Sequence, residues 1–398
     1  MTSAVAVIDG EHYPPVVRDA LAALPYDVVG AWLAGGSEKL RGDGEYGVPL
    51  LRRLEDGFAD ADVVVDLSDE PVLSPPDRFL LASRVLAAGL RYEGADFHFA
   101  PPTYAAFPLP SLAVIGTGKR VGKTAVTGHV ARLLAREADV VVVAMGRGGP
   151  AHPVTCDVAP TLESLVELSR AGEHAASDYL ETAALAGVVT IGCRRAGGGL
   201  AGTCTTSNVL EGAELARERG PDVVVFDGSG AAIPPVATDA RILVCGSAQD
   251  PIAYLNAYRV LVSDLVVCVG RTDAERIRAL KDVAVVNADL RLRPMTPVSG
   301  RRVAVFTTGD APTDHLDAEL TLVSRNLADR ARLRDDLARA DADVYLVEIK
   351  AAAIDVVAEA AHDRGIEVVF AENEVVPLDG EPDLDELIRG LVPIGARA

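Results

Sequence analysis

A lysine and a threonine at the end of a glycine-rich turn are the residues whose types and spacing most clearly indicate chemistry. Lys123 and Thr124 close the run Gly-Thr-Gly-Lys-Arg-Val-Gly-Lys-Thr, which begins at Gly116. Glycines let a backbone bend until successive N–H groups point at one anion. A lysine followed by a hydroxyl residue then reaches the terminal phosphates and a Mg²⁺ ion. The turn is therefore predicted to be a phosphate-binding P-loop.

The spacing of this loop is a variant one. Thr117 stands where the common pattern has a glycine, and the glycine comes one place earlier, at Gly116. Arginine is abundant in the chain and lysine is rare, yet Lys119 and Lys123 both lie in this loop. A compact ammonium group suits a phosphate cradle better than a wide guanidinium fork. The predicted nucleotide-binding residues are Thr117, Gly118, Lys119, Arg120, Val121, Gly122, Lys123, Thr124 and Ala125.

Two further glycine-rich stretches carry arginines. They are Met145–Pro150 and Gly192–Gly202, and each follows a predicted strand. Guanidinium groups bind phosphate bidentately, so we predict that these stretches hold a strongly anionic substrate. The alternative is a pair of flexible loops with solvated arginines, and His174 fits a structural role equally well. The predicted substrate-binding residues are Arg147, Gly148, Gly149, His174, Arg194, Arg195 and Gly198.

A carboxylate ends the apolar run Pro221–Asp227. P-loop enzymes commonly hold Mg²⁺ with such an acid and with the hydroxyl of the P-loop. We therefore predict that Thr124 and Asp227 bind the metal, the alternative being that Asp227 is a turn residue before glycine. Asp239 is a weaker metal candidate, and Asn287–Asp289 is a weak candidate for contact with a nucleotide base.

Strand and helix signals alternate along the whole chain, and they must position these residues. The P-loop follows a predicted strand, Leu112–Ile115, and precedes a predicted helix, Ala125–Glu137. Alternation of this kind predicts a parallel sheet covered by helices, which brings the ends of its strands to one edge. The predicted fold class is α/β, with a central P-loop domain of mostly parallel sheet and smaller α/β modules on both sides.

A chain of 398 residues is too long for one ordinary core. The predicted domains are 1–105 (Rossmann-like), 111–290 (P-loop) and 301–398, with linkers at the proline-rich stretch 100–110 and at Arg291–Pro297. In the first domain, Gly47–Phe58 is predicted to be helical and Leu90–Phe99 to be a strand. Asp9–His12 and Asp66–Asp69 follow strands, where they are either ligand-binding residues or ordinary loop residues and caps.

Composition excludes several classes of partner. The formal net charge of −20 argues against nucleic acid and anionic membranes. We see no apolar stretch long enough to span a membrane and no signal-peptide pattern. The 5 cysteines are an odd number without C-x-x-C spacing, which favours reduced thiols and a cytoplasmic protein.

Four motifs, in order, resemble the cyclic 2,3-diphosphoglycerate synthetase family. They are Gly-Thr-Gly-Lys-Arg-Val-Gly-Lys-Thr, Met-Gly-Arg-Gly-Gly-Pro, Gly-Cys-Arg-Arg-Ala-Gly-Gly-Gly and Asp-Gly-Ser-Gly-Ala-Ala-Ile-Pro-Pro. The similarity begins at Tyr92–Phe97, runs through the central domain and reaches both ends more weakly. The loop spacing is also similar to dethiobiotin synthetase. One departure is Asp227, where some relatives are expected to have glutamate.

This resemblance implies an enzyme that converts 2,3-diphosphoglycerate and ATP into cyclic 2,3-diphosphoglycerate, ADP and phosphate, with Mg²⁺ and as a homodimer. It implies catalytic roles for Lys123, Lys119, Arg147 and Arg194. Two alternatives remain at this point. One is a carboxylate ligase of dethiobiotin synthetase type, and the other is a nucleotide-switched ATPase of the partitioning or metal-insertase kind. The first leaves Arg194 and Arg195 harder to explain, and the second requires a protein partner.

Overall fold

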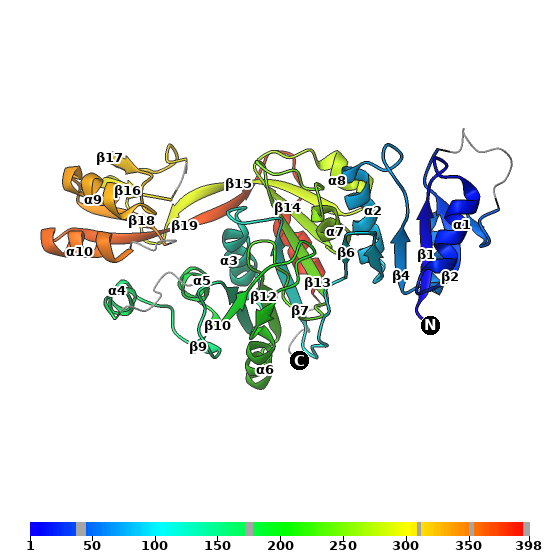
Figure 1. Cartoon of the computed structure of the whole chain (residues 1–398). Helices are drawn as coiled ribbons and strands as arrows, with labels where there is room; N and C mark the ends of the chain where they lie inside the picture. The colour runs from blue at the N-terminus through cyan, green and yellow to red at the C-terminus, as the bar shows by residue number, and fades with distance from the viewer. Residues whose placement is uncertain (37–44, 172–177, 309–311, 350–353, 393–398) are drawn as a thin grey trace.

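A computed structural model describes residues 1–36, 45–171, 178–308, 312–349 and 354–392. Three parts follow one another along an elongated molecule, with the N-terminal domain at one end, the P-loop domain in the middle and the C-terminal module at the other end (Figure 1). The described strands form two sheets, one of 6 strands and one of 13. The predicted α/β class with mostly parallel strands is confirmed.

The N-terminal sheet has the strand order β3-β2-β1-β4-β5-β6, and only β6 runs antiparallel to its neighbour. Side chains of β1 alternate between two hydrophobic clusters, with Val5 and Val7 facing one way and Ala6 and Ile8 the other. This alternation is what a strand covered on both faces requires. The elements are β1 (Ser3–Ile8), α1 (Pro14–Ala23), β2 (Asp27–Leu33), β3 (Leu50–Leu51), the 3₁₀ helix η2 (Leu54–Asp60), β4 (Val63–Asp66), α2 (Pro75–Ala87), β5 (Arg91–Glu93) and β6 (His98–Phe99).

Two predictions for this domain are wrong in part. The segment Gly47–Phe58 is not one helix, because its first half joins the sheet as the edge strand β3, and the Pro49 carbonyl accepts a hydrogen bond from Ala31 N at 2.9 Å. The segment Leu90–Phe99 is not one strand but a hairpin of β5 and β6. Its turn places the Phe97 ring where a Cβ on Gly94 would stand, so glycine is needed there.

The larger sheet has the order β11-β10-β8-β12-β7-β13-β14-β15-β19-β18-β16-β17, with β9 added on β10. The P-loop strand β7 lies between β12 and β13, in the parallel part of the sheet. The elements of the P-loop domain are β7 (Ser111–Gly116), α3 (Lys123–Leu134), β8 (Val140–Gly146), β9 (Val154–Cys156), α4 (Leu162–Arg170), α5 (Asp178–Ala186), β10 (Val189–Ala196), β11 (Thr206–Ser207), α6 (Val209–Arg219), β12 (Val223–Asp227), β13 (Ala240–Gly246), α7 (Asn256–Leu261), β14 (Leu265–Val269), α8 (Ala274–Leu280) and β15 (Ala284–Pro294).

The predicted linker Arg291–Pro297 is wrong over its first half. Residues 291–294 are the end of β15, which pairs antiparallel with β19 (Glu367–Pro377) from Ala288↔Pro377 to Pro294↔Ala371. Alternating apolar and arginine residues are compatible with a half-exposed strand, although Pro294 is also typical of a linker. The P-loop domain and the C-terminal module therefore share one continuous sheet, and Figure 1 shows the two long strands joining them.

The C-terminal module continues this sheet beyond β19. Its strand β17 lies at the sheet's edge and was not anticipated. The final helix packs away from the module, because Leu384 and Ile388 join the cluster that contains Leu112 and Val126 of the P-loop domain. The remaining elements are β16 (Arg302–Phe306), β17 (Glu319–Ser324), α9 (Arg330–Arg339), β18 (Val344–Glu348), α10 (Ile354–Arg364) and α11 (Leu384–Leu391).

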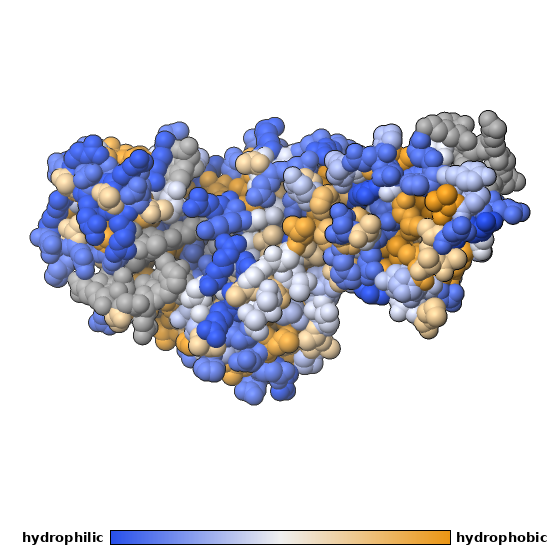
Figure 2. Space-filling view, viewed as in Figure 1, coloured by the Kyte–Doolittle hydropathy of each residue, from blue (hydrophilic) through white to orange (hydrophobic). Residues whose placement is uncertain are grey.

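The proline-rich stretch 100–110 lies along the P-loop domain. Ala105 N donates to the Pro235 carbonyl at 3.0 Å, and the Phe107 ring meets Phe226 edge-on at 5.1 Å. In Figure 2 the surface over the C-terminal module is mainly hydrophilic, whereas hydrophobic residues gather over the N-terminal sheet. Among the described residues, no helix combines the length and apolar character that a membrane span needs.

Candidate active site

The P-loop joins β7 to α3 at the carboxyl edge of the sheet. None of the backbone N–H groups of residues 118–122 donates a hydrogen bond to another described residue. Gly122 has φ +91°, and a Cβ on it would lie 2.7 Å from Cγ2 of Val269, so only glycine fits there. The loop ends at the N-terminus of a 12-residue helix, where the helix dipole favours an anion.

A buried ion pair lies under this loop. Lys123 Nζ donates to Asp227 Oδ1 at 2.5 Å, and Thr127 Oγ1 donates to the same oxygen at 2.8 Å. Asp227 is only 1% exposed. Burial raises the pKa of its carboxyl group, and the charge and hydrogen bonds of Lys123 and Thr127 only partly oppose that shift. The first lysine of α3 is thus held beside the acid that ends β12.

Two more oxygen-bearing side chains, those of Thr124 and Asp178, belong to the same part of the fold as this pair. The hydroxyl of Thr124 hydrogen-bonds to none of the described residues, and Thr124 follows Lys123 directly. A second carboxylate comes from Asp178, the first residue of α5, whose Oδ2 would lie 3.4 Å from a Cβ on Gly146. The negative charge of Asp178 contributes to the raised pKa of Asp227. These groups have the chemistry that Mg²⁺ prefers.

Two guanidinium groups converge on the loop after β12. A Cβ placed on Gly230 would lie 2.6 Å from Nη2 of Arg147 and 3.6 Å from Nη2 of Arg195. Arg195 also donates to the carbonyls of Gly197 at 2.6 Å and Ser229 at 2.8 Å. Burial, and then the positive charge of Arg147, lower the pKa of Arg195. Because the Gly230 carbonyl lies 3.0 Å from the Cβ position of Gly116, this cationic pair adjoins the P-loop.

The structure corrects the prediction that Arg194 and Arg195 form one clamp in a loop. Both residues belong to β10, where Arg194 pairs with Gly146 of β8. Side chains of neighbouring strand residues point to opposite faces, so Arg194 faces away from Arg195. It lies on the face where Gly192 meets Tyr179 of α5, and its backbone N–H donates to Oδ1 of Asn208 at 2.7 Å. The Arg194 side chain is exposed.

The other predicted residues fall into three groups. Lys119 and Arg120 are exposed at the turn of the P-loop, whereas Val121 and Ala125 are buried beneath it. The glycines around the arginines allow close approach: a Cβ on Gly149 would collide with the Cys193 carbonyl, and one on Gly198 would lie 3.2 Å from Nη1 of Arg195. Gly148 is exposed. His174 lies outside the described residues.

The two weaker candidates from the sequence, Asp239 and Asn287, have hydrogen bonds that join parts of the fold. Asp239 Oδ2 accepts from Ser111 N at 2.9 Å, at the start of β7 and thus at the opposite edge of the sheet from the P-loop. Asn287 accepts from Thr272 N at 3.0 Å and donates to Glu381 at 2.8 Å. The side chain of Asn287 therefore joins the end of β15 to neighbouring segments.

Several residues of the site were not predicted. Thr127 lies one helical turn after Lys123, so an i, i+4 reading of α3 would have found it. Gln249 accepts a hydrogen bond from Thr117 Oγ1 at 2.7 Å, and nothing in its sequence surroundings indicates this. Arg259 is 2% exposed and donates to the carbonyls of Leu200 and Ala231, which ties the glycine-rich segment to the loop after β12. Burial lowers the pKa of Arg259 to about 10.

Three family models match this chain one after another, from residue 3 to residue 374. Family models described as cyclic 2,3-diphosphoglycerate synthetase match with their N-terminal domain at residues 3–100, their P-loop domain at 111–294 and their C-terminal domain at 294–374. Curated proteins named cyclic 2,3-diphosphoglycerate synthetase are similar to this chain. The one from Rubrobacter xylanophilus is 46% identical over 94% of this chain and 95% of its own length.

Relatives of lower sequence identity give the same result. The protein of that name from Thermococcus kodakarensis is 40% identical over 99% of this chain and 98% of its own length, and the one from Methanothermobacter thermautotrophicus is 38% identical over 98% and 95%. With three family models side by side and relatives that align almost from end to end, this chain belongs to the cyclic 2,3-diphosphoglycerate synthetase family.

Proposed function

We propose that this protein is an ATP-dependent cyclic 2,3-diphosphoglycerate synthetase, which converts 2,3-diphosphoglycerate and ATP into the cyclic pyrophosphate, ADP and phosphate. The observation that carries this function is the pair of guanidinium groups of Arg147 and Arg195 beside the P-loop. One nucleotide does not need them, and a substrate with two phosphates on adjacent carbons does. The names of its relatives agree.

The P-loop is the proposed nucleotide site, formed by residues 117–125. Its uncommitted N–H groups and the N-terminus of α3 suit the phosphates of ATP. Lys123 and Lys119 are the proposed catalytic cations, which stabilise negative charge on the transferred phosphoryl group. Lys123 exchanges part of its contact with Asp227 for the nucleotide.

Thr124 and Asp227 are the proposed ligands of Mg²⁺, and the negative charge of Asp178 acts on Asp227. When bound, the ion would neutralise negative charge on the phosphates of ATP. Burial raises the pKa of Asp227, and a nearby positive charge opposes that shift. Lys123 already supplies one such charge at 2.5 Å.

Arg147, Arg194 and Arg195 are the proposed cations of the 2,3-diphosphoglycerate site, with Gly148, Gly149, Gly198 and His174 around them. Arg147 and Arg194 are exposed, so both are available to a substrate. Arg195 is tied to Gly197 and Ser229, which fixes the direction of its guanidinium group. Because Arg194 faces the other side of β10, it approaches the substrate separately from Arg147 and Arg195.

The proposed chemistry has two steps. A phosphate oxygen of the substrate attacks the γ-phosphorus of ATP, the bond to ADP breaks, and the substrate carries a new phosphoanhydride. An oxygen of the substrate's other phosphate then attacks the activated phosphorus, which closes the P–O–P ring and expels inorganic phosphate. Both reacting groups are on one molecule, so ring closure needs no second encounter. The arginines offset the repulsion between the two phosphates.

The order of these steps is testable with oxygen isotopes. If the phosphate oxygens of 2,3-diphosphoglycerate are labelled with ¹⁸O, the expelled phosphate must carry one of them, because the broken bond joins that oxygen to the activated phosphorus of the substrate. Mass spectrometry of the released phosphate measures this. Phosphate without substrate oxygen would show that the steps occur in another order.

We also propose a homodimer in the cytoplasm. All five cysteines are free thiols, which suits a reducing compartment. The proposed working units remain residues 1–105, 111–290 and 301–398, although β15 continues past residue 290 and α11 packs on the P-loop domain.

The function is tested by the dependence of ADP release on the substrate. With ATP and Mg²⁺, 2,3-diphosphoglycerate should raise the rate strongly, whereas 3-phosphoglycerate, which has one phosphate, should not. ADP release that requires a carboxylate substrate without phosphates, or a protein partner, would replace this proposal with a ligase or a switch ATPase.

A further inference from the structure

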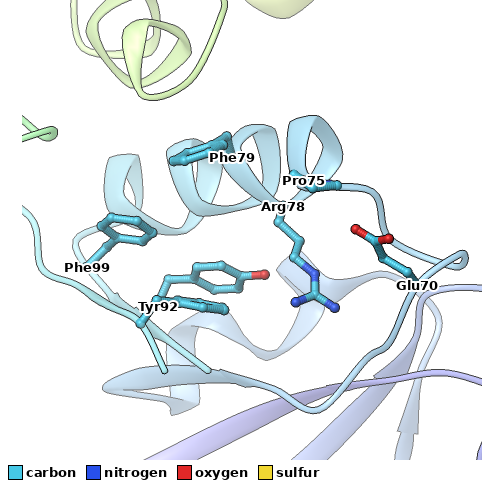
Figure 3. A pocket seen from close by; sticks show the side chains of 7 residues that line it. Glu70, Pro75, Arg78, Phe79, Tyr92 and Phe99 are labelled. Carbon is cyan, nitrogen blue, oxygen red and sulfur yellow. The ribbon is translucent and has the colours of Figure 1, made fainter. Parts of the chain in front are cut away.

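The N-terminal domain contains a cavity that the proposed reaction does not use. It has a volume of about 210 Å³ and is lined by Glu70, Pro75, Arg78, Phe79, Tyr92, Phe97 and Phe99. The motif Tyr92–Phe97, which contributed to the family resemblance, supplies part of its wall. In Figure 3, Arg78 and Phe79 come from α2 above the Tyr92 ring, and the Glu70 carboxylate lies at the far side of Arg78. The cavity lies near the carboxyl ends of β4 and β5, where α/β sheets commonly bind ligands.

Its walls are mainly aromatic rings. Phe97 lies 5.3 Å from Tyr92 and 5.9 Å from Phe99, at small interplanar angles of 32° and 29°. Phe79 lies 6.0 Å from Phe99. These rings pack on one another and together give the cavity an apolar, aromatic wall. Because ligand pockets for drug-sized molecules are roughly 300–1,000 Å³, this smaller cavity suits one planar ring system.

The polar groups of the cavity have fixed roles. Tyr92 donates its hydroxyl proton to Asp66 Oδ2 at 2.5 Å, and burial, with the charge of Asp66, raises the pKa of that phenol. Arg78 Nη2 donates to the Ser68 carbonyl at 2.5 Å. Nη1 of Arg78 donates to none of the described residues, and the Glu70 side chain is exposed at the rim. Nε of Arg78 is likewise buried without a hydrogen-bond partner among the described residues. The cavity therefore offers donors from Arg78 and an acceptor from Glu70.

The charges around the cavity indicate which class of ligand it can bind. Asp66 and Glu70 offset the positive charge of Arg78, which lies 3.6 Å from Asp66 between Nε and Oδ2. Asp9 and Asp69 lie at the same edge of the sheet and add negative charge. A phosphate group would be repelled here, which excludes 2,3-diphosphoglycerate. A ring with an amino group for Glu70 and a ring nitrogen for Arg78 satisfies both polar groups and stacks on the aromatic walls.

We propose that this cavity is a second ligand site, separate from the P-loop, that binds an amino-substituted heteroaromatic ring of the adenine type. Its position makes the ligand a neighbour of the P-loop domain. Phe79 meets Tyr254 edge-on at 5.4 Å, and Tyr254 follows the segment that carries Gln249, the partner of Thr117 in the P-loop. Only the Phe79 and Tyr254 rings therefore separate the adenine-type ring from the P-loop domain.

The test is calorimetric titration of the full-length protein with adenosine, after the P-loop has been saturated with Mg²⁺ and a non-hydrolysable ATP analogue. Adenosine should bind once per chain, and uridine, which has no exocyclic amino group, should bind more weakly. Phe99→Ala should weaken adenosine binding about 5- to 150-fold, as for removal of a base-stacking ring. Glu70→Gln should weaken it roughly two- to tenfold, because a charge-assisted hydrogen bond is replaced by a neutral one.

Glu45→Gln is the matched control, because Glu45 is an exposed carboxylate of the same domain outside the cavity; it should bind adenosine as the unaltered protein does. Phe99→Leu keeps the apolar volume and provides a second variant if Phe99→Ala does not fold. Adenosine that fails to bind at millimolar concentration, that is displaced by the ATP analogue, or that binds equally to Glu70→Gln and to the folded Phe99 variant would overturn the proposal.

Discussion

The two sheets differ in what their backbone N–H donors bind at the carboxyl ends of the parallel strands. In the P-loop domain, the N–H groups of residues 118–122 bond to none of the described residues, and exposed cations lie around them. In the N-terminal domain, Asp9 Oδ1 accepts from Glu11 N at 2.9 Å and His12 N at 3.1 Å, and its Oδ2 accepts from Asp69 N at 2.6 Å. There the protein's own carboxylate is the anion.

Asp66 repeats this arrangement one strand away. Its Oδ1 accepts from Ser68 N at 2.8 Å and from the Ser68 hydroxyl at 2.5 Å. Asp9 and Asp66 are both buried and end neighbouring strands. An α/β edge that binds phosphate leaves its amide donors open, whereas one that fills them with aspartates is closed to anions. The same type of fold thus has open amide donors at this edge in one domain and amide donors occupied by aspartates in the other.

A change at Lys123 should have the largest effect on the P-loop edge. We expect Lys123→Ala to reduce turnover by at least about a thousandfold, because it removes a charge from the phosphoryl group in transfer and leaves Asp227 buried without its cation. ADP release and thermal melting would be measured together. Lys281→Ala is the control, since Lys281 bonds only to the Ser263 carbonyl among the described residues. Full activity in Lys123→Ala would contradict the nucleotide site.

Arg194→Ala should have the next largest effect. One charged contact to phosphate is worth roughly 1.5–3 kcal/mol, which is about one to two decades. We expect the KM for 2,3-diphosphoglycerate to rise, or kcat to fall, by that factor while ATP affinity stays unchanged. Arg217→Ala is the control, since Arg217 is an exposed arginine of α6 paired with Glu214. A collapse of ATP affinity in Arg194→Ala would assign Arg194 to the nucleotide instead.

Thr127→Val tests the hydrogen bond that Thr127 donates to Asp227. It removes one of the two hydrogen bonds that hold Oδ1, so we expect kcat to fall about three- to tenfold and the requirement for Mg²⁺ to increase. Thr190→Val is the control, because the buried hydroxyl of Thr190 bonds only to the nearby Val188 carbonyl among the described residues. Equal effects of the two variants on the Mg²⁺ requirement would mean that Thr127 has only a packing role.

Asp9→Asn should change activity least and stability most clearly. Burial alone would raise the pKa of Asp9, but hydrogen bonds from His12 and from the amides of Asp69 and His12 outweigh it and leave the pKa below 3.8. The ionised carboxylate therefore stabilises the fold above about pH 3.8, and this contribution is lost as the pH falls through the lower folded-state pKa. We expect the variant to lose about 1–3 kcal/mol at neutral pH.

Urea titrations at several pH values would measure this loss. The difference between Asp9→Asn and the unaltered protein should narrow as the pH falls below about 4. A difference that disappears between pH 7 and pH 5 would mean that another group, with a higher pKa, controls this edge. A strong loss of kcat would mean that the N-terminal edge takes part in the reaction.

Much of this site could be predicted from sequence because its residues lie in local motifs. The P-loop, Asp227 and Arg147 all stand at the ends of apolar strands, where a parallel sheet gathers them. The face of Arg194 could not be fixed in this way, because Gly192–Gly202 was predicted to follow a strand and not to begin within β10. The alternation of strand side chains depends on where pairing stops. Asp178 and Gln249 reach the site from segments that carry no motif.

The fold was predictable to the same degree. Regular βα alternation predicted the mostly parallel α/β fold, but the antiparallel pair of β15 and β19 was missed, since it depends on contacts between residues about eighty positions apart. The path of α11 back to the P-loop domain was missed for the same reason. Its apolar residues Leu384 and Ile388 predict a buried helix face and do not indicate which domain covers it.

The central claim is that an ATP-dependent ring closure occurs at the anion-binding edge of the P-loop domain. ³¹P NMR of a reaction containing the protein, ATP, Mg²⁺ and 2,3-diphosphoglycerate tests it most directly. The account predicts a cyclic pyrophosphate signal that grows in step with ADP and is absent when ATP is omitted. ATP turnover that is indifferent to 2,3-diphosphoglycerate, with no such signal, would contradict it.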